Sequence, residues 1–156
     1  MGNGHPISAL AARPQLLETF AREKKYFNTF GGNSVSCAVA LAVLDVIERE
    51  RLLANARANG EHLRQGLARL AQRYPWMREI RGTGLFWGVE LAAHPDSGLS
   101  ARQEAARVVN DLRRRGVLVG ATGRDNNVLK IRPPLVIGRA EVDFLVDTLG
   151  ETLGNP

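Results

Sequence analysis

The sequence predicts an α/β protein whose C-terminal half is a compact α+β unit. Two observations favour this class. From residue 79 onward the hydrophobic pattern alternates strand, helix, strand, strand and helix, which predicts a small sheet with one face covered by two helices. Upstream, residues 14–73 show mainly helical periodicity. With 156 residues, of which 44% are hydrophobic and 24% charged, the chain can bury a core of its own.

Three helices are predicted in the N-terminal half, after a loop and a short strand at residues 1–12. The first, 14–24, is short and amphipathic. The second, 34–51, is apolar on most of its surface, which predicts burial against something larger. The third, 52–73, has leucines at i, i+4 and i+7 and ends before Pro75, because the residue preceding a proline is steered away from helix.

The C-terminal half begins with a β region, in which period-2 alternation predicts a strand at residues 85–91. Ser100 can cap the start of the next helix, and Gly116 can close its C-terminal end. The remaining predicted elements are two short strands and a last helix, at 117–119, 128–131 and 139–153.

The most informative motif is Asn28-Thr29-Phe30-Gly31-Gly32-Asn33, directly before the apolar helix. Adjacent glycines allow tight backbone with positive φ. A helix start carries unpaired N–H groups and the positive end of the dipole, so together with the Thr29 hydroxyl it can bind an anion such as a phosphate. The alternative is a simple Gly-Gly turn in which Asn33 or Ser34 caps the helix.

The motif belongs to one of four informative blocks, which are GNGHPISAL, YFNTFGGNSVSCAVALAVLDVIE, IRGTGLFWGVEL and LKIRPPLVI, in that order. Together they resemble the C-terminal portion of the class III (ornithine/4-aminobutyrate type) pyridoxal-phosphate-dependent aminotransferases, over essentially the whole chain. The resemblance implies part of a fold type I transferase, with a small antiparallel-rich sheet covered by helices. Residues 1–75 would then end the large cofactor-binding domain, including its long interdomain helices, and residues 76–156 would form the small α+β domain.

The resemblance also implies pyridoxal 5'-phosphate as cofactor, which requires a Schiff-base lysine. The chain has three lysines, Lys24, Lys25 and Lys130. Lys24 and Lys25 are predicted to be surface groups at a helix end, and the family's catalytic lysine lies just upstream of the GNG segment. No catalytic residue is therefore assigned, and we expect the chain to be a fragment of a longer enzyme that is inactive alone.

Cofactor binding is assigned by resemblance to Thr29, together with Asn28. This position in the family donates a hydrogen bond to the cofactor phosphate of the neighbouring subunit. The resemblance thus implies a homodimer with shared active sites.

Substrate binding is assigned to Lys130 and Arg132, because cations next to a rigid Pro-Pro turn can bind a carboxylate or a phosphate. Typical class III aminotransferases have an arginine where Lys130 stands. Lysine at this position, like the HP and YFNTFGGN segments, resembles the phospholyase branch, which acts on phosphorylated amino alcohols. Lysine cannot form the planar fork of arginine, whereas Arg132 can. The alternative is a strand whose lysine points to solvent.

Three other features are interpreted as structural. Arg81-Gly82-Thr83-Gly84 suggests a bulge or a close backbone approach. His5 is interpreted as a loop residue that could line a pocket, and Cys37 as core packing.

Composition disfavours several function classes. The net charge is +5, but the arginines are dispersed and the single run, Arg113–Arg115, has no interleaved aromatics, so a nucleic-acid-binding domain is not favoured. The sequence shows no membrane-spanning stretch, secretory signal or metal-ligand spacing. The predicted function is amino-group transfer between an amine or amino acid and a keto acid in the cytoplasm. The alternatives are phospho-elimination and a non-catalytic dimerisation or interaction module.

Overall fold

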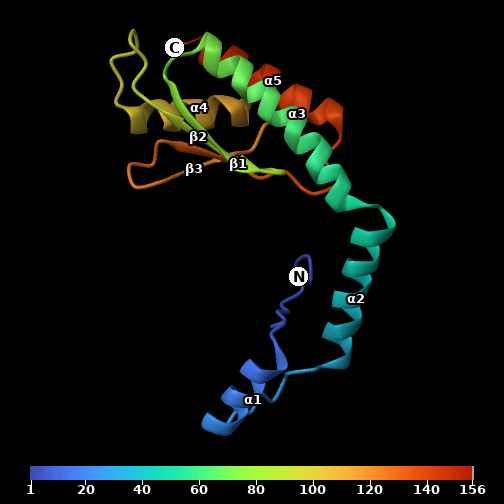
Figure 1. Cartoon of the computed structure of the whole chain (residues 1–156). Helices are drawn as coiled ribbons and strands as arrows, with labels where there is room; N and C mark the ends of the chain where they lie inside the picture. The colour runs from blue at the N-terminus through green and yellow to red at the C-terminus, as the bar shows by residue number, and fades with distance from the viewer. Residues whose placement is uncertain (156) are drawn as a thin grey trace. The chain divides into compact units, whose positions relative to one another are not determined.

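The computed structural model describes residues 1–155 (Figure 1). Its internal contacts divide the chain into two compact units, the N-terminal unit Met1–Arg51 and the C-terminal unit Leu52–Pro156. The N-terminal unit contains α1 (Pro14–Glu23) and α2 (Ser34–Arg49). The C-terminal unit contains, in order, α3 (Leu52–Arg73), β1 (Met77–Thr83), β2 (Phe86–Leu91), α4 (Ala101–Arg114), β3 (Gly120–Thr122), β4 (Val128–Ile131) and α5 (Arg139–Leu153).

The strands of the C-terminal unit form one sheet in the order β1-β2-β4-β3. All neighbouring strands are antiparallel, which confirms the predicted antiparallel-rich sheet. β1 and β2 are joined by a tight turn that contains Gly84 at φ +53. Along β2 the side chains of Trp87, Val89 and Leu91 are buried, whereas Phe86 is 56% exposed. The predicted period-2 alternation of this strand is confirmed.

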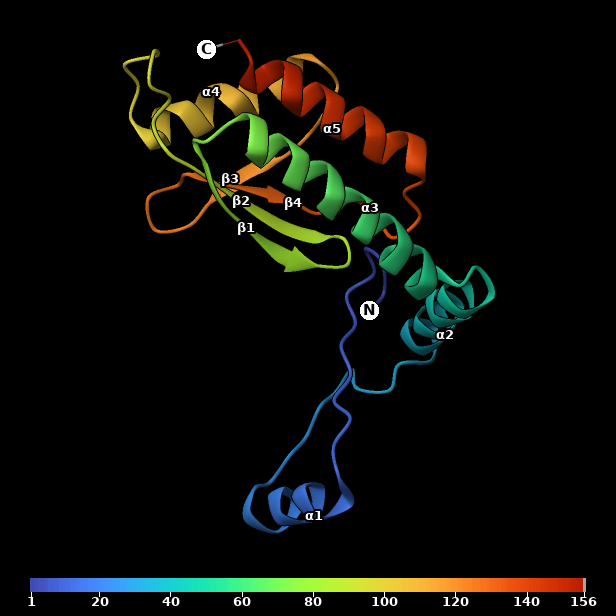
Figure 2. The same cartoon turned by 45° about the horizontal axis from the view of Figure 1, so that its top comes forward.

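Three helices, not the predicted two, cover the buried face of the sheet. Figure 2 shows α3, α4 and α5 on the same side of the strands. α3 packs against α5 and β1, and its residues Leu63 and Leu67 are fully buried. The predicted leucine spacing of α3 therefore marks the side that faces this core.

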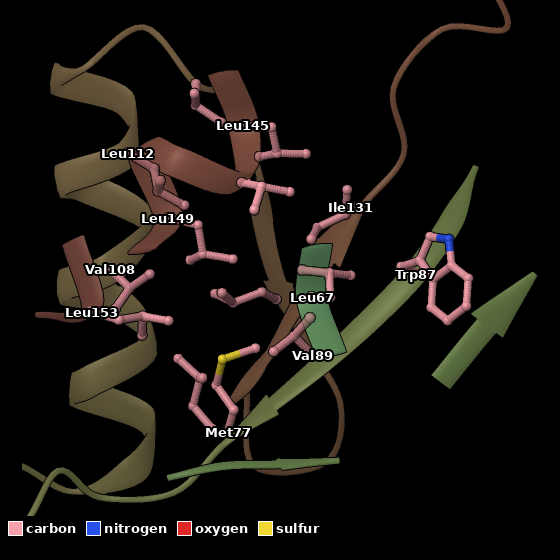
Figure 3. Packing of buried hydrophobic residues seen from close by; sticks show 14 of the residues in the cluster. Leu67, Met77, Trp87, Val89, Val108, Leu112, Ile131, Leu145, Leu149 and Leu153 are labelled. Carbon is pink, nitrogen blue, oxygen red and sulfur yellow. The ribbon is translucent and has the colours of Figure 1, made fainter. Parts of the chain in front are cut away.

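The core of the C-terminal unit lies between the sheet and these helices (Figure 3). Helix α5 contributes Val142, Leu145, Val146 and Leu149, the four residues that the sequence predicts as its buried side. Fully buried side chains from the other elements pack against them; they include Leu67, Val89, Val108, Leu112 and Leu129. Burial of an aliphatic side chain of this size contributes about 1.5–3 kcal/mol relative to exposure, so this core is the main source of stability.

The ends of α4 explain one wrong prediction. Ser100 caps the helix in a capping box with Gln103, and Gly116 closes it at φ +89, as predicted. The amide of Val117 then donates to the carbonyl of Leu112 (2.8 Å), which closes the helix end. Because this amide is used by the helix, the predicted strand at 117–119 does not form, and β3 begins at Gly120 instead.

The N-terminal unit differs from prediction in two respects. Residues 1–12 form no strand; a single bridge joins Gly2 and His5 around a turn in which Asn3 and Gly4 have positive φ. Cys37 is exposed, so its assignment to core packing is wrong. Only Ala40 of the apolar helix α2 is buried, which leaves most of that helix uncovered in this chain.

Candidate functional site

The start of α2 is organised by two asparagine side chains. Asn33 is the N-cap, and its Oδ1 accepts from the backbone amides of Val35 and Ser36, both at 3.1 Å. Gly32 has φ +71, a conformation that favours glycine. The Gly-Gly turn and the Asn33 cap are therefore as the sequence predicts.

Asn28 shapes the same turn. Its Oδ1 accepts from the amides of Phe30 (3.1 Å) and Gly31 (3.0 Å), and its Nδ2 donates to the Tyr26 hydroxyl (3.1 Å). The expectation of a cluster of unpaired amides is thus largely wrong, because Asn28 and Asn33 together occupy four of them. Asn28 uses its side chain within the turn.

Thr29 remains available to a ligand. Its side chain is exposed, and among residues 1–155 its hydroxyl has no hydrogen-bond partner. In the same part of the chain the backbone amides of Gly32 and Ser34 also lack an acceptor. The turn before the 16-residue helix α2 therefore retains one hydroxyl and two amides as donors, which is the kind of group that binds a phosphate.

A cavity of about 750 Å³ lies beside this turn within the N-terminal unit. Its lining includes Asn28, Asn33 and the predicted pocket residue His5, whose Nε2 lies 2.8 Å from Ser36 Oγ. Thr29 does not line this cavity.

On the sheet of the C-terminal unit, Lys130 lies in a row of four residues that crosses all strands. The register pairs Arg81 with Gly88, Gly88 with Lys130, and Lys130 with Gly120. Leu129 and Ile131, its neighbours along β4, are buried in the core, so Lys130 stands on the opposite, outer face. Both cross-strand neighbours of Lys130 are glycines, although the side chains of Val128 and Arg81 reach the space over Gly88 (3.2 and 3.8 Å from the position of a Cβ there).

Arg81 and Lys130 line one cavity of about 360 Å³ on this outer face. Arg81 is paired with two carboxylates, Glu90 at 3.2 Å and Glu79 at 2.6 Å. The hydrogen bond to Glu90, and next the charge of Glu79, raise the pKa of the Arg81 guanidinium. Within residues 1–155 Lys130 has no ion pair. Of the two cations that line this cavity, Lys130 is therefore the one without an ion pair in the described residues, while the second carboxylate bound to Arg81 balances the charge of Lys130.

Arg132, the second predicted substrate residue, is exposed and lines a different cavity of about 560 Å³. That cavity is mostly apolar and also contains Pro133, Pro134 and Glu141. The two predicted cations thus lie on one strand and its extension but line separate cavities.

Arg81 is a site residue that sequence reasoning missed. The Arg81–Gly84 segment is architectural, as predicted, because a Cβ at Gly82 would lie 2.2 Å from Phe86 O and one at Gly60 of α3 would lie 2.1 Å from Gly84 O. The β-bulge, however, lies between Met77 and Glu79 rather than at the glycines. Only the strand register, which places Arg81 across from Gly88, could have revealed its cavity.

Among residues 1–155 no group of three or more His, Cys, Asp or Glu side chains could hold a metal ion. In the same residues no helix combines the length and the apolar character needed to cross a membrane.

Comparison with known proteins shows the family of this chain. The model of the class III aminotransferases matches residues 1–153. The chain is 39% identical to alanine–glyoxylate aminotransferase 2 homolog 2, mitochondrial, of Arabidopsis thaliana, over 96% of this chain and 31% of that protein. It is 36% identical to ethanolamine-phosphate phospho-lyase homolog 1 of Caenorhabditis elegans, over 98% of this chain and 33% of that protein.

Solved structures of a phospholyase and of transaminases agree with this family match. A phospholyase from Arthrobacter in complex with phosphoethanolamine matches with a TM-score of 0.93 and 42% identity, over 100% of this chain and 37% of that one. The chain spans about a third of the length of the curated relatives that it matches. Its fold is that of the fold type I transaminases, and their cofactor is pyridoxal phosphate. The chain belongs to the class III aminotransferase family.

Proposed function

We propose that this chain supplies the anion-binding residues of a pyridoxal-phosphate-dependent enzyme that acts on a phosphorylated amino alcohol and releases phosphate. The row Arg81–Gly88–Lys130–Gly120 is the observation that carries the proposal. It places an ammonium that has no ion pair within residues 1–155 beside two glycines in an open cavity, and an ammonium is a point charge suited to a phosphate or carboxylate of the substrate. The 42% identity to a phospholyase in complex with phosphoethanolamine supports the phosphate.

Amino-group transfer is the second candidate reaction. The family model and the similarity to the Arabidopsis thaliana aminotransferase favour it. Because the two cations line separate cavities, either Lys130 or Arg132 would then bind the carboxylate of an amino acid or keto acid, and Arg132 could do so through two parallel hydrogen bonds.

Thr29 is proposed to hold the phosphate of the cofactor, which when bound supplies the electron sink for chemistry at the amino-bearing carbon. Thr29 would donate its hydroxyl proton, while Asn28 keeps the turn in shape through the amides of Phe30 and Gly31. We further propose that Thr29 serves the cofactor of a second subunit in a homodimer.

None of the three lysines is proposed to carry the cofactor. Lys24 and Lys25 are exposed in the N-terminal unit, and Lys130 is assigned to the substrate. The 156-residue chain should therefore show neither phosphate release from phosphoethanolamine nor amino transfer from alanine to glyoxylate. Turnover that is abolished by replacing one of these lysines with methionine would contradict this assignment.

Two further parts of the proposal concern organisation and location. Residues 1–75 are proposed to end a large cofactor-binding domain and residues 76–156 to form a small domain; both remain predictions. The cytoplasmic location also stays a prediction.

Binding measurements test the proposed sites directly. In NMR titrations of the chain, phosphoethanolamine should shift the Lys130 side-chain resonances, ethanolamine should not, and Lys130→Met should weaken binding. Equal responses to both compounds would overturn the phosphate assignment, and a stronger response to alanine would favour amino transfer. For the cofactor site, pyridoxine 5'-phosphate should bind more weakly to Thr29→Val than to the control Thr19→Val, whose hydroxyl bonds within α1.

A further inference from the structure

Two asparagines of α3 hold the turn that follows Arg132. Asn55 Nδ2 donates to the carbonyl oxygens of Leu135 (2.7 Å) and Ile137 (3.0 Å). Asn59 Nδ2 donates to Ile137 O (3.0 Å) and to Asn55 Oδ1 (2.8 Å). These four hydrogen bonds form the Asn55–Asn59 clamp. Three of them join segments 78 to 82 positions apart in sequence, and the fourth links the two asparagines within α3.

The clamp has a fixed direction. Both loop atoms are carbonyl oxygens and can only accept, so Asn55 must present its NH₂ group to them. Its Oδ1 faces Asn59, which donates to it. A carboxylate at position 55 could not replace this arrangement, since it offers no proton and would repel both carbonyls.

Few other contacts hold this turn. Leu135 and Val136 are 40% and 61% exposed, and only Ile137 packs at the edge of the core. Within the turn, the Ile137 amide donates to the carbonyl of Pro134 (3.0 Å). The three bonds from α3 are therefore the main polar connection between this turn and the rest of the C-terminal unit.

Arg132 depends on this turn for its placement. Among residues 1–155 its side chain makes no hydrogen bond or ion pair. The backbone that leaves it passes through Pro133 and Pro134, whose rings fix φ, and then enters the clamped turn. The two rings leave only ψ free at positions 133 and 134, which limits how far the backbone of Arg132 can move relative to the clamped turn.

We propose that Asn55 and Asn59 are positioning residues that orient Arg132 for binding an anionic substrate. The inference deepens the proposed function and rests on it for the identity of the ligand. The clamp does not touch the ligand; it reduces the number of conformations that Arg132 must give up when it binds.

The first experiment tests the clamp without any ligand. Asn55→Asp keeps the size of the side chain and removes the donor. The amide resonances of residues 135–138 should move in this variant, and they should return toward wild-type positions as the pH falls, since a protonated carboxyl can again donate. The two carbonyls should raise the pKa of this introduced carboxyl above its usual value of about 3.9. If the amide resonances of residues 135–138 do not move in Asn55→Asp, or do not return as the pH falls, the clamp does not exist.

The second experiment tests its consequence for binding. Inorganic phosphate at pH 7 should bind to Asn55→Asp and Asn59→Asp roughly three to ten times more weakly than to the wild-type chain, the loss expected for about one hydrogen bond. Asn110→Asp is the matched control, because it adds the same charge at an exposed position of α4, where within residues 1–155 the Asn110 side chain bonds only to Ala106 O. The phosphate affinity of Asn110→Asp should stay near that of the wild-type chain. Unfolding midpoints of all variants, measured in parallel, identify any general loss of stability.

The outcomes separate the two proposals. A wild-type chain that shows no phosphate-induced shifts at Lys130 and Arg132 contradicts the proposed function, and the ligand-free titration still decides whether the clamp exists. A wild-type chain that binds phosphate, with both aspartate variants equal to Asn110→Asp, overturns the positioning role.

Discussion

Among single residues, the buried carboxyl group of Glu104 carries the clearest prediction for stability. Glu104 is fully buried, and its Oε1 is 2.5 Å from the Arg107 guanidinium. Arg107 also donates to Asn155 O (2.7 Å), beyond the end of α5. Arg107→Met removes the partner and leaves a buried charge, so the free energy of unfolding should fall by about 3–5 kcal/mol in urea denaturation.

The control for this prediction is Arg114→Met on the same helix. Arg114 pairs with Asp111, but its side chain is 63% exposed, and such pairs contribute about 1 kcal/mol or less. Similar losses in the two variants would show that burial of Glu104 does not determine the cost.

Glu61 carries a prediction for pH dependence. Its hydrogen bond from Arg64, and next that from Gln65, lowers the pKa of the Glu61 carboxyl from 4.5 to about 2. Because the folded-state pKa is depressed, this pair stabilises the fold above the unfolded pKa, and the contribution disappears as the pH falls from about 4.5 through about 2. Carboxyl ¹³C NMR should give a pKa near the ordinary value in Arg64→Met and an intermediate value in Gln65→Met. An unchanged low pKa in Arg64→Met would contradict the stated cause.

What sequence can predict for single residues depends on the range of the interaction. The Asn33 cap and the Gly32 conformation follow from neighbours in the chain, and both were predicted. The occupation of the turn amides by Asn28 was missed, because an asparagine before a glycine turn gives no sign of which amides it will bind. The partnership of Arg81 with Lys130 was also missed, since it requires the register of three strands.

For whole elements, a close backbone approach joins α3 at Gly60 to the β1–β2 turn at Gly84. A Cβ at Gly60 would lie 2.1 Å from the backbone oxygen of Gly84, and that turn cannot move freely because Trp87 Nε1 donates to the same oxygen (2.7 Å). Gly60→Ala gains about 1 kcal/mol of helix propensity, but overpacking against backbone costs about 1–3 kcal/mol or more. We expect a net loss of stability in chemical denaturation.

Gly150→Ala in α5 is the matched control for this substitution. Its Cβ would meet only the side-chain atom Leu70 Cδ2, at 3.0 Å, which can shift by a few tenths of an ångström. The variant should be neutral or slightly stabilised. A Gly60→Ala variant as stable as Gly150→Ala would contradict the close approach.

The helices were predictable because their periodicity and caps are local. The bounds of helix α5 and four of its eight buried residues were predicted, and α4 was predicted from its caps at Ser100 and Gly116. Strand β3 was not, because the competition between the end of α4 and the sheet for the Val117 amide is decided by geometry. The role of α3 as the third helix that covers the sheet was also missed, because its leucine spacing does not indicate which element it packs against.

For the molecule as a whole, the two units differ in how well this chain covers their apolar surfaces. The C-terminal unit buries its core, while α1 has no buried residue and α2 has one. The sequence indicated this contrast for α2, since a helix that is apolar on most of its surface requires a covering surface. Which surface covers it was not predictable, because periodicity describes only one side of a contact.

This contrast predicts that the 156-residue chain self-associates. Val35, Leu41 and Leu44 of α2 are 67%, 62% and 47% exposed, and exposed apolar side chains gathered on one helix favour association. Sedimentation velocity should show oligomers that increase with protein concentration. The double substitution of Leu41 and Leu44 by glutamate should shift the distribution toward monomer, because burying these carboxylates in an interface is costly. Leu118→Glu, at an 83% exposed site in the C-terminal unit, should leave the distribution of oligomers unchanged. A wild-type chain that stays monomeric at all concentrations, or an equal effect of Leu118→Glu, would show that α2 does not drive association.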